Sequence, residues 1–90
     1  MKIVNKSEMK ELSKKPIVFA EDELIPSSLM ISKNGGTKAE ELAPYAGVDV
    51  EFDLNIDEYE DDATFIVFDD DDIYQMILKL RLCNNLRGME

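Results

Sequence analysis

The 90-residue sequence contains no histidine and no tryptophan, and it has a single cysteine, Cys83. Without histidine, the chain lacks the commonest general base near neutral pH and the commonest zinc ligand, and a serine or cysteine nucleophile lacks its usual activator. A lone cysteine excludes an internal disulfide, which is typical of a reducing compartment. We therefore expect a cytoplasmic protein that is not an enzyme and that holds no metal and no cofactor.

Long apolar runs are also missing. No stretch approaches the roughly 20 apolar residues that cross a bilayer, and residues 1–12 alternate charged with apolar side chains instead of forming a signal-peptide core. Hydrophobic residues nevertheless make up 44% of the chain, which is ordinary for a globular protein of one domain. The sequence predicts a single folded domain over residues 1–90, neither secreted nor membrane-bound.

Basic residues are absent from one long region. Residues 1–40 contain seven lysines and six acidic residues, whereas residues 41–72 contain thirteen acidic residues and no lysine or arginine. The last 18 residues add Lys79, Arg81 and Arg87 against Glu90, and the net charge is −10. Dense like charge destabilises a compact fold. Either these carboxylates only keep the protein soluble, or they form a docking surface for a basic partner.

Turn and capping signals divide the first half of the chain into short elements. Asn5 and Glu8 have the spacing of a capping box, which predicts a helix after a first short strand, and Pro16 ends that helix. Thr37 and Glu40 repeat the pattern. The elements expected here are strands at 2–4, 17–20 and 28–33, a turn at Asn34-Gly35-Gly36, and a short helix at 38–43.

The second half begins with the clearest pattern in the chain. Apolar residues occupy every second position from Val48 to Ile56 and alternate with polar ones, mainly acidic, which predicts a half-buried strand with an acidic outer face. Thr64–Phe68 is the next expected strand. Joined by the charged segment 57–62, the two are expected to pair as an antiparallel hairpin.

A C-terminal helix is predicted from about Asp69 to Asn84 or Asn85, with aspartates capping its start. It carries two apolar stripes. The first stripe, expected to face the core, is Ile73, Met76, Ile77, Leu80 and Cys83. The second stripe is Tyr74, Leu78 and Leu82. We expect the second stripe either to be covered by another helical segment of the chain or to form a contact between two copies of the chain.

These elements predict the α+β class. We expect a small, mainly antiparallel sheet of three to five strands, with the C-terminal helix packed on one face and a short N-terminal helix.

Calcium and nucleotide motifs are absent. Asp53, Asn55 and Asp57 match the start of a calcium loop, but Glu58 replaces the required glycine and Thr64 the bidentate glutamate. The glycines of the expected turn lack the Gly-Lys-Ser/Thr of a phosphate loop.

The acidic residues suggest a mimic of nucleic acid. Asp49, Glu51 and Asp53 on one strand face would be spaced by about 6.6 Å, close to the spacing of successive phosphates. Direct binding to nucleic acid is disfavoured by the same charge. Tyr59 is either a binding hot spot within the patch or folds back over the base of its own loop. The predicted partner-binding residues are Asp49, Glu51, Asp53, Asp57, Glu58, Tyr59, Glu60, Asp61 and Asp62.

Several short segments resemble a loose group of small proteins encoded by bacteriophages and prophages. The resemblance lies in the opening Met1–Val4, the strand Ile17–Ala20 after a proline, the segment Leu29–Lys33, and Phe65–Asp69 leading into Asp72-Ile73. It implies a phage origin and a bacterial host cytoplasm. Small acidic phage proteins are similar in kind to inhibitors of host-defence and nucleic-acid-processing enzymes.

Three hypotheses of function follow. The first is a noncatalytic inhibitor or adaptor that binds a basic surface, that of a nucleic-acid-binding protein, through the predicted partner-binding residues. The second is an immunity-type protein that neutralises a toxin nuclease. The third is an assembly module that oligomerises through Tyr74, Leu78 and Leu82, with no role for nucleic acid or membrane.

Overall fold

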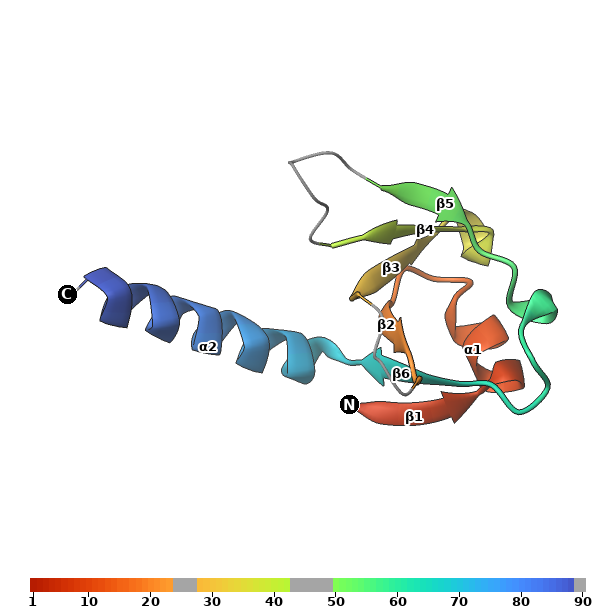
Figure 1. Ribbon diagram of the computed structural model, residues 1–90, viewed down its shortest axis with the longest axis horizontal. Coiled ribbons are helices and arrows are strands. Elements are labelled where there is room, and N and C mark those ends of the chain that lie inside the picture. The colour runs from red at the N-terminus through yellow and green to blue at the C-terminus, as the bar shows by residue number, and fades with distance from the viewer. Residues whose placement is uncertain (24–27, 43–49, 89–90) are drawn as a thin grey trace.

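The computed structural model describes residues 1–23, 28–42 and 50–88 of the chain. Within these residues, six strands form one antiparallel sheet in the order β1-β6-β2-β3-β4-β5, with one helix after β1 and a longer one after β6 (Figure 1). The α+β class is confirmed, although the sheet has more strands than the expected three to five. The elements are β1 (Lys2–Asn5), α1 (Lys6–Leu12), β2 (Val18–Glu21), β3 (Met30–Lys33), η1 (Asn34–Gly36), β4 (Lys38–Glu41), β5 (Glu51–Asp53), η3 (Ile56–Glu58), β6 (Thr64–Phe68) and α2 (Asp70–Gly88).

β1, α1 and β2 form a split β-α-β unit around β6, because β6 pairs antiparallel with both strands. The start of α1 is fixed by its sequence. The Asn5 side chain accepts a hydrogen bond of 2.8 Å from the backbone N–H of Glu8, and the Glu8 side chain accepts one from the backbone N–H of Asn5. The expected capping box is therefore confirmed.

The turn after β3 leads into a strand instead of the helix expected at 38–43. All three residues of η1 have positive φ, from 52° at Asn34 to 93° at Gly36, and this reversal lays β4 antiparallel on β3. The Thr37 hydroxyl, expected to cap a helix, donates to the Asn34 carbonyl at 2.8 Å. The helix prediction was therefore wrong: the segment pairs with β3 as a strand, which buries Ala39 and leaves its neighbours half-buried.

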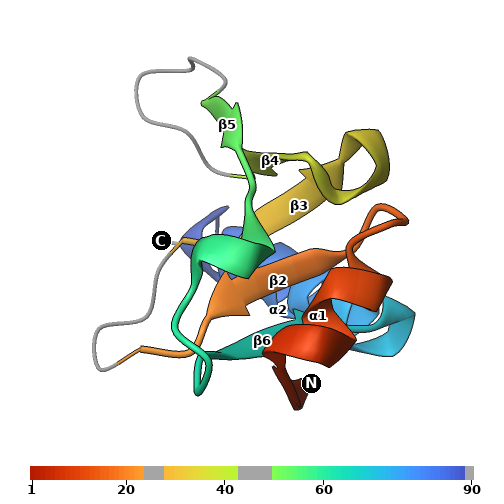
Figure 2. The ribbon, with the colours of Figure 1, turned by 90° about the vertical axis from the view of Figure 1, so that its right-hand side faces the viewer.

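β5 and β6 do not form the expected hairpin. β5 pairs with β4, with Phe52 opposite Ala39, and so lies at the far edge of the sheet from β6. The chain between them passes beside α1 (Figure 2). Leu54 and Ile56 in this connection are buried. The hairpin prediction was wrong because these apolar side chains draw the connection across the core instead of into a tight loop.

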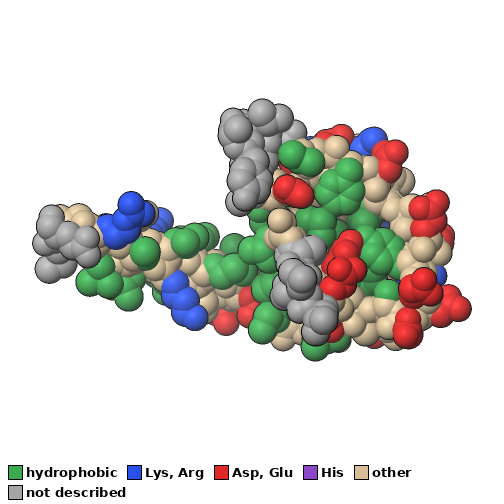
Figure 3. All heavy atoms as spheres, viewed as in Figure 1, with side chains coloured by type: hydrophobic (Ala, Val, Ile, Leu, Met, Phe, Trp, Pro, Cys, Tyr) green, Lys and Arg blue, Asp and Glu red, His purple; other side chains and the backbone are tan. Residues whose placement is uncertain are grey.

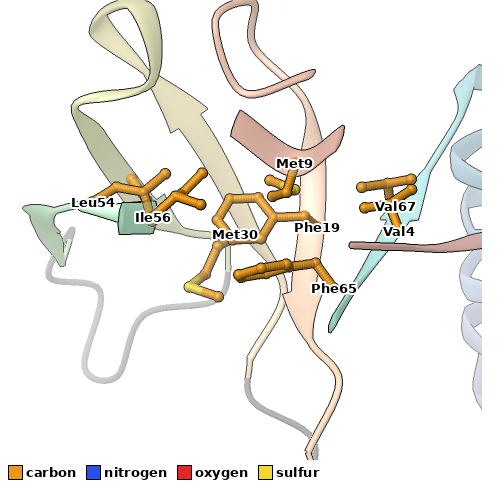
Figure 4. Packing of buried hydrophobic residues seen from close by; sticks show 9 residues of the cluster. Val4, Met9, Phe19, Met30, Leu54, Ile56, Phe65 and Val67 are labelled. Atoms are coloured by element: carbon orange, nitrogen blue, oxygen red, sulfur yellow. The ribbon is translucent and has the colours of Figure 1, made fainter. Parts of the chain in front are cut away.

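The core is a single cluster between the sheet, α1 and the connection after β5 (Figure 4). Its centre is aromatic: the ring centroids of Phe19 and Phe65 lie 6.5 Å apart with an edge-to-face geometry, which is a favoured aromatic arrangement. The buried members are Val4, Met9, Phe19, Met30, Ala39, Leu54, Ile56, Phe65 and Val67.

α2 does not pack on the sheet. Only Asp69 separates it from β6, and the helix continues away from the sheet (Figure 1). None of its described residues is buried, so the expected packing on one face was wrong. Its acid-capped start is confirmed, since Asp69 Oδ1 accepts from the N–H of Asp72 at 2.8 Å and Asp72 Oδ2 accepts from the N–H of Asp69 at 3.0 Å.

Candidate protein-binding surfaces

The carboxylates of β5 are paired with lysines of neighbouring strands. Lys33 Nζ lies 2.7 Å from Glu40 Oε2 and 2.9 Å from Glu51 Oε2, and Lys38 Nζ lies 2.5 Å from Asp53 Oδ1. Donation from these lysines lowers the pKa of Glu51 and of Asp53. The outer face of β3, β4 and β5 is thus a ladder of alternating charges, and its acidic residues are largely neutralised.

Two lysines of α1 hold the connection that contains the predicted acidic loop. Lys6 Nζ donates to the carbonyl oxygens of Asp57 at 3.0 Å and Tyr59 at 2.8 Å, and lies 3.5 Å from Asp61 Oδ1. Lys10 Nζ lies 2.9 Å from both Asp57 carboxylate oxygens. Asp57 therefore helps to fix the loop on α1, whereas the Asp61 side chain near Lys6 is fully exposed to solvent.

Tyr59 packs over the hydrophobic base of its own loop. Its ring centroid lies 5.0 Å from that of Phe65, edge to face, and its hydroxyl donates to Glu21 Oε1. Burial and this hydrogen bond raise the pKa of the Tyr59 hydroxyl. Of the two alternatives for Tyr59, the geometry favours an anchor of the fold, although part of the ring remains at the surface.

Carboxylates without ion pairs remain around Tyr59. Glu58, Glu60 and Asp62 are exposed and make no ion pair with any residue that the structure describes. Two open hollows of about 650 and 280 Å³ adjoin one another here and share Tyr59 and Glu60. We call this region the Tyr59 surface and define it as Asp22, Glu23, Glu58, Tyr59, Glu60 and Asp62. Asp49, also predicted to bind a partner, lies outside the described residues.

Side chains that could perform chemistry serve the fold instead. Ser32, which is fully buried, donates its hydroxyl to the Lys15 carbonyl at 2.8 Å and accepts from the N–H of Ile17 at 3.1 Å. Within the described ranges, no group of three or more acidic, cysteine or histidine side chains could hold a metal ion. No helix of that part of the chain is long and apolar enough to cross a bilayer.

α2 presents a second and larger candidate surface. Both stripes include exposed residues, although Ile73 and Met76 near the start of the helix are half-buried, and Figure 3 shows hydrophobic side chains on several sides of the helix. Leu80 of the first stripe is 65% exposed and Leu82 of the second is 58% exposed. The first stripe was expected to face the core, and this was wrong because the helix leaves the sheet. Leu86, also exposed, continues the second stripe by another four residues.

The sequence analysis missed the lysine partners of the acidic residues and the exposure of the first stripe. Charge counts along the chain treat residues 41–72 as uncompensated, whereas the sheet brings lysines of earlier segments beside them. The sequence did contain a signal that α2 is not simply packed on the sheet. Its apolar residues lie on more than one side of the helix, and a helix of this kind requires neighbours on more than one side.

Comparisons with protein-family models, with curated proteins and with solved structures give no match to this chain. The resemblance to small phage-encoded proteins therefore stays a prediction. The function must be argued from the two surfaces themselves.

Proposed function

We propose that this protein is a noncatalytic assembly module that binds other protein chains through α2. The observation that supports this is the combination of two apolar stripes with the absence of any buried side chain among the described residues of the helix. Beyond Met76, no apolar surface among the described residues covers the helix.

An isolated helix is marginal in water, and most helical stability in proteins comes from packing of an apolar face. Soluble monomers rarely leave large contiguous apolar patches uncovered, and such patches mark interaction sites. The capped start at Asp69 and Asp72 holds α2 in place as a helix, so a partner meets a preformed element and the ordering cost of binding is reduced.

The second stripe is tested by Leu78→Asp combined with Leu82→Asp. Tagged protein is used to capture proteins from a bacterial lysate. The matched control is Gln75→Asp with Asn85→Asp, which adds the same charge at polar positions of the same helix. We expect the control to keep its bound chains and the stripe variant to lose them. Equal retention by both variants would contradict the proposal.

Docking on a basic protein surface is a second candidate function. It is favoured by Glu58, Glu60 and Asp62, whose charge no described lysine neutralises. A nucleic-acid-binding protein presents positively charged surfaces, and the electrostatic attraction between opposite charges steers the association of two proteins. Both the inhibitor and the immunity hypotheses would use the Tyr59 surface.

An immobilised arginine-rich peptide tests this second candidate. Glu58→Lys with Glu60→Lys is compared with Asp70→Lys and Asp71→Lys, which changes the net charge equally at a distant site. If the Tyr59 surface binds basic proteins, the first variant loses more affinity than the second. Equal losses would show that only the total charge of the protein acts on the peptide.

A further inference from the structure

We infer that α2 pairs antiparallel with α2 of a second copy of this chain, through four residues of the first stripe. This inference rests on the proposed function, because both use α2 as the binding element. It goes further by naming the partner, the stripe and the register. The second stripe stays outside such a pair and remains accessible to other proteins.

The spacing of the first stripe is that of a helix–helix seam. Ile73, Met76, Leu80 and Cys83 follow one another at intervals of three, four and three residues, the alternation found in coiled coils. Leu80 and Cys83, toward the far end, are exposed. In Figure 1 this half of α2 projects well beyond the strands, so the sheet of the same chain does not cover it.

Charge along α2 selects the direction of pairing. The helix begins with three aspartates, Asp70 to Asp72, and its later residues include Lys79, Arg81 and Arg87 but no acidic residue. Two parallel copies would place like charges side by side. Two antiparallel copies place the acidic start of each helix beside the basic end of the other and also oppose the two helix dipoles.

A single register satisfies the apolar and the charged residues together. A two-fold axis makes every contact reciprocal. Placing Leu80 against Met76 of the second copy also places Cys83 against the second copy's Ile73. The next seam position, Arg87, then lies beside the second copy's Asp69. The seam is therefore apolar along its length and closed by an opposite-charge pair at each end.

An apolar hollow continues this seam at the base of the helix. It has a volume of about 210 Å³ and includes Asp69 and Asp72 in its lining. These aspartates precede Ile73 and Met76 by four residues, so the hollow lies on the same side of α2 as the seam. In the antiparallel pair, the end of the second copy's helix reaches this hollow. Its apolar lining is Met1, Leu12, Ile17, Val67 and Phe68.

The oligomeric state of the purified chain is the first test, measured by size-exclusion chromatography with light scattering. We expect a dimer for the wild type, a monomer for Leu80→Asp, and a dimer for the matched control Gln75→Asp. Urea unfolding, monitored by tyrosine fluorescence, establishes that each variant is folded. The signal of Tyr59 is identified by comparison with the Tyr59→Phe variant. A monomeric wild type would overturn the inference, while loss of capture by Leu78→Asp with Leu82→Asp would still support the proposed function.

Disulfide formation tests the register. Ile73→Cys, combined with the native Cys83, should give a covalent dimer on oxidation, because the two positions face each other across the seam. Gln75→Cys should not. Native Cys83 pairs would be separated by ten residues along the axis, about 15 Å, which is too far for a disulfide. Rapid cross-linking of the wild type through Cys83 would indicate parallel helices and overturn the antiparallel arrangement.

Discussion

Phe65 in β6 and Leu80 in α2 belong to consecutive elements, yet Phe65 is fully buried and Leu80 is 65% exposed. The sheet and α1, which we call the body, satisfy their polar groups internally: no buried side-chain nitrogen or oxygen that the structure describes lacks a hydrogen-bond partner. In α2, only the first turn has its polar groups capped by side chains of the same chain, and the apolar side chains farther along the helix are exposed. One chain thus combines a unit whose apolar side chains pack against one another with a helix whose apolar side chains stay largely at the surface.

The largest expected effect comes from comparing Phe65→Ala with Leu82→Ala. Phe65 contacts the rings of Phe19 and Tyr59, and removing a buried phenylalanine costs about 3–5 kcal/mol of unfolding free energy. Leu82→Ala should leave the stability of the body unchanged in dilute protein. Urea unfolding of both variants measures this. A large loss for Leu82→Ala would mean that α2 is part of the cooperative body.

A glycine pair sharpens the comparison inside the body. A Cβ at Gly36 would lie 2.7 Å from Ser13 Oγ and 3.1 Å from the Ser13 carbonyl oxygen, at a φ of +93°. Gly36→Ala should therefore cost about 3 kcal/mol. Gly35 also has positive φ but open space around it, so Gly35→Ala should cost only about 1 kcal/mol. Equal melting temperatures for the two variants would show that the turn does not press on the end of α1.

Tyr59 gives the stability of the body a dependence on pH in the alkaline range. Its pKa is raised by burial and by the bond to Glu21, so the neutral phenol is stabilised in the folded state. This stability is present below about pH 10, the unfolded pKa, and is lost as pH rises through the higher folded value. Tyr59→Phe should lower the free energy of unfolding by about 1 kcal/mol at neutral pH. It should also abolish the loss of stability at high pH that the Tyr59 hydroxyl causes. Denaturant unfolding at several pH values provides the measurement.

The smallest expected effect concerns the charge ladder on β3, β4 and β5. Lys33→Gln should raise the pKa of Glu51 toward its ordinary value, because the donation from Lys33 that lowers it is gone. In the wild type, the contribution of this pair is present above the ordinary pKa of glutamate and is lost as pH falls through the lowered value. Exposed pairs contribute little to stability, so NMR titration of the Glu51 carboxyl is the suitable measurement. Lys79→Gln on α2 is the matched control and should leave the Glu51 pKa unchanged.

Much of the fold could be predicted from local signals. The capping box at Asn5, the positive-φ turn at Asn34 and the strand Thr64–Phe68 depend on residues close in sequence, and all three predictions are confirmed. Strand partners could not be predicted in the same way. In β5, Phe52 is half-buried between two exposed acidic residues, as the alternation predicts, although the strand covers only Glu51–Asp53. A period of two does not indicate which strand lies beside it.

The binding surfaces show the same limit. Glu51 and Asp53 do lie on one outer strand face, as the alternation predicts. Their neutralisation depends on Lys33 and Lys38, which the order of strands brings beside them. The exposure of both stripes depends on the direction in which α2 leaves β6. That direction follows from a single linking residue, Asp69, and periodicity within the helix does not reveal it.

The order of strands also bears on how the chain folds. β6 inserts between β1 and β2, with Lys2 opposite Val67, so the pairing of the edge strand β1 joins segments that lie far apart in the sequence. Such non-local contacts form slowly, whereas a helix forms through local bonds within about a microsecond. We expect the entry of β6 to limit the refolding rate and helix variants such as Leu82→Ala to leave that rate unchanged in stopped-flow experiments. A chain emerging during synthesis would thus hold an incomplete sheet until Phe68 has left the ribosome, and α2 would emerge only after all six described strands.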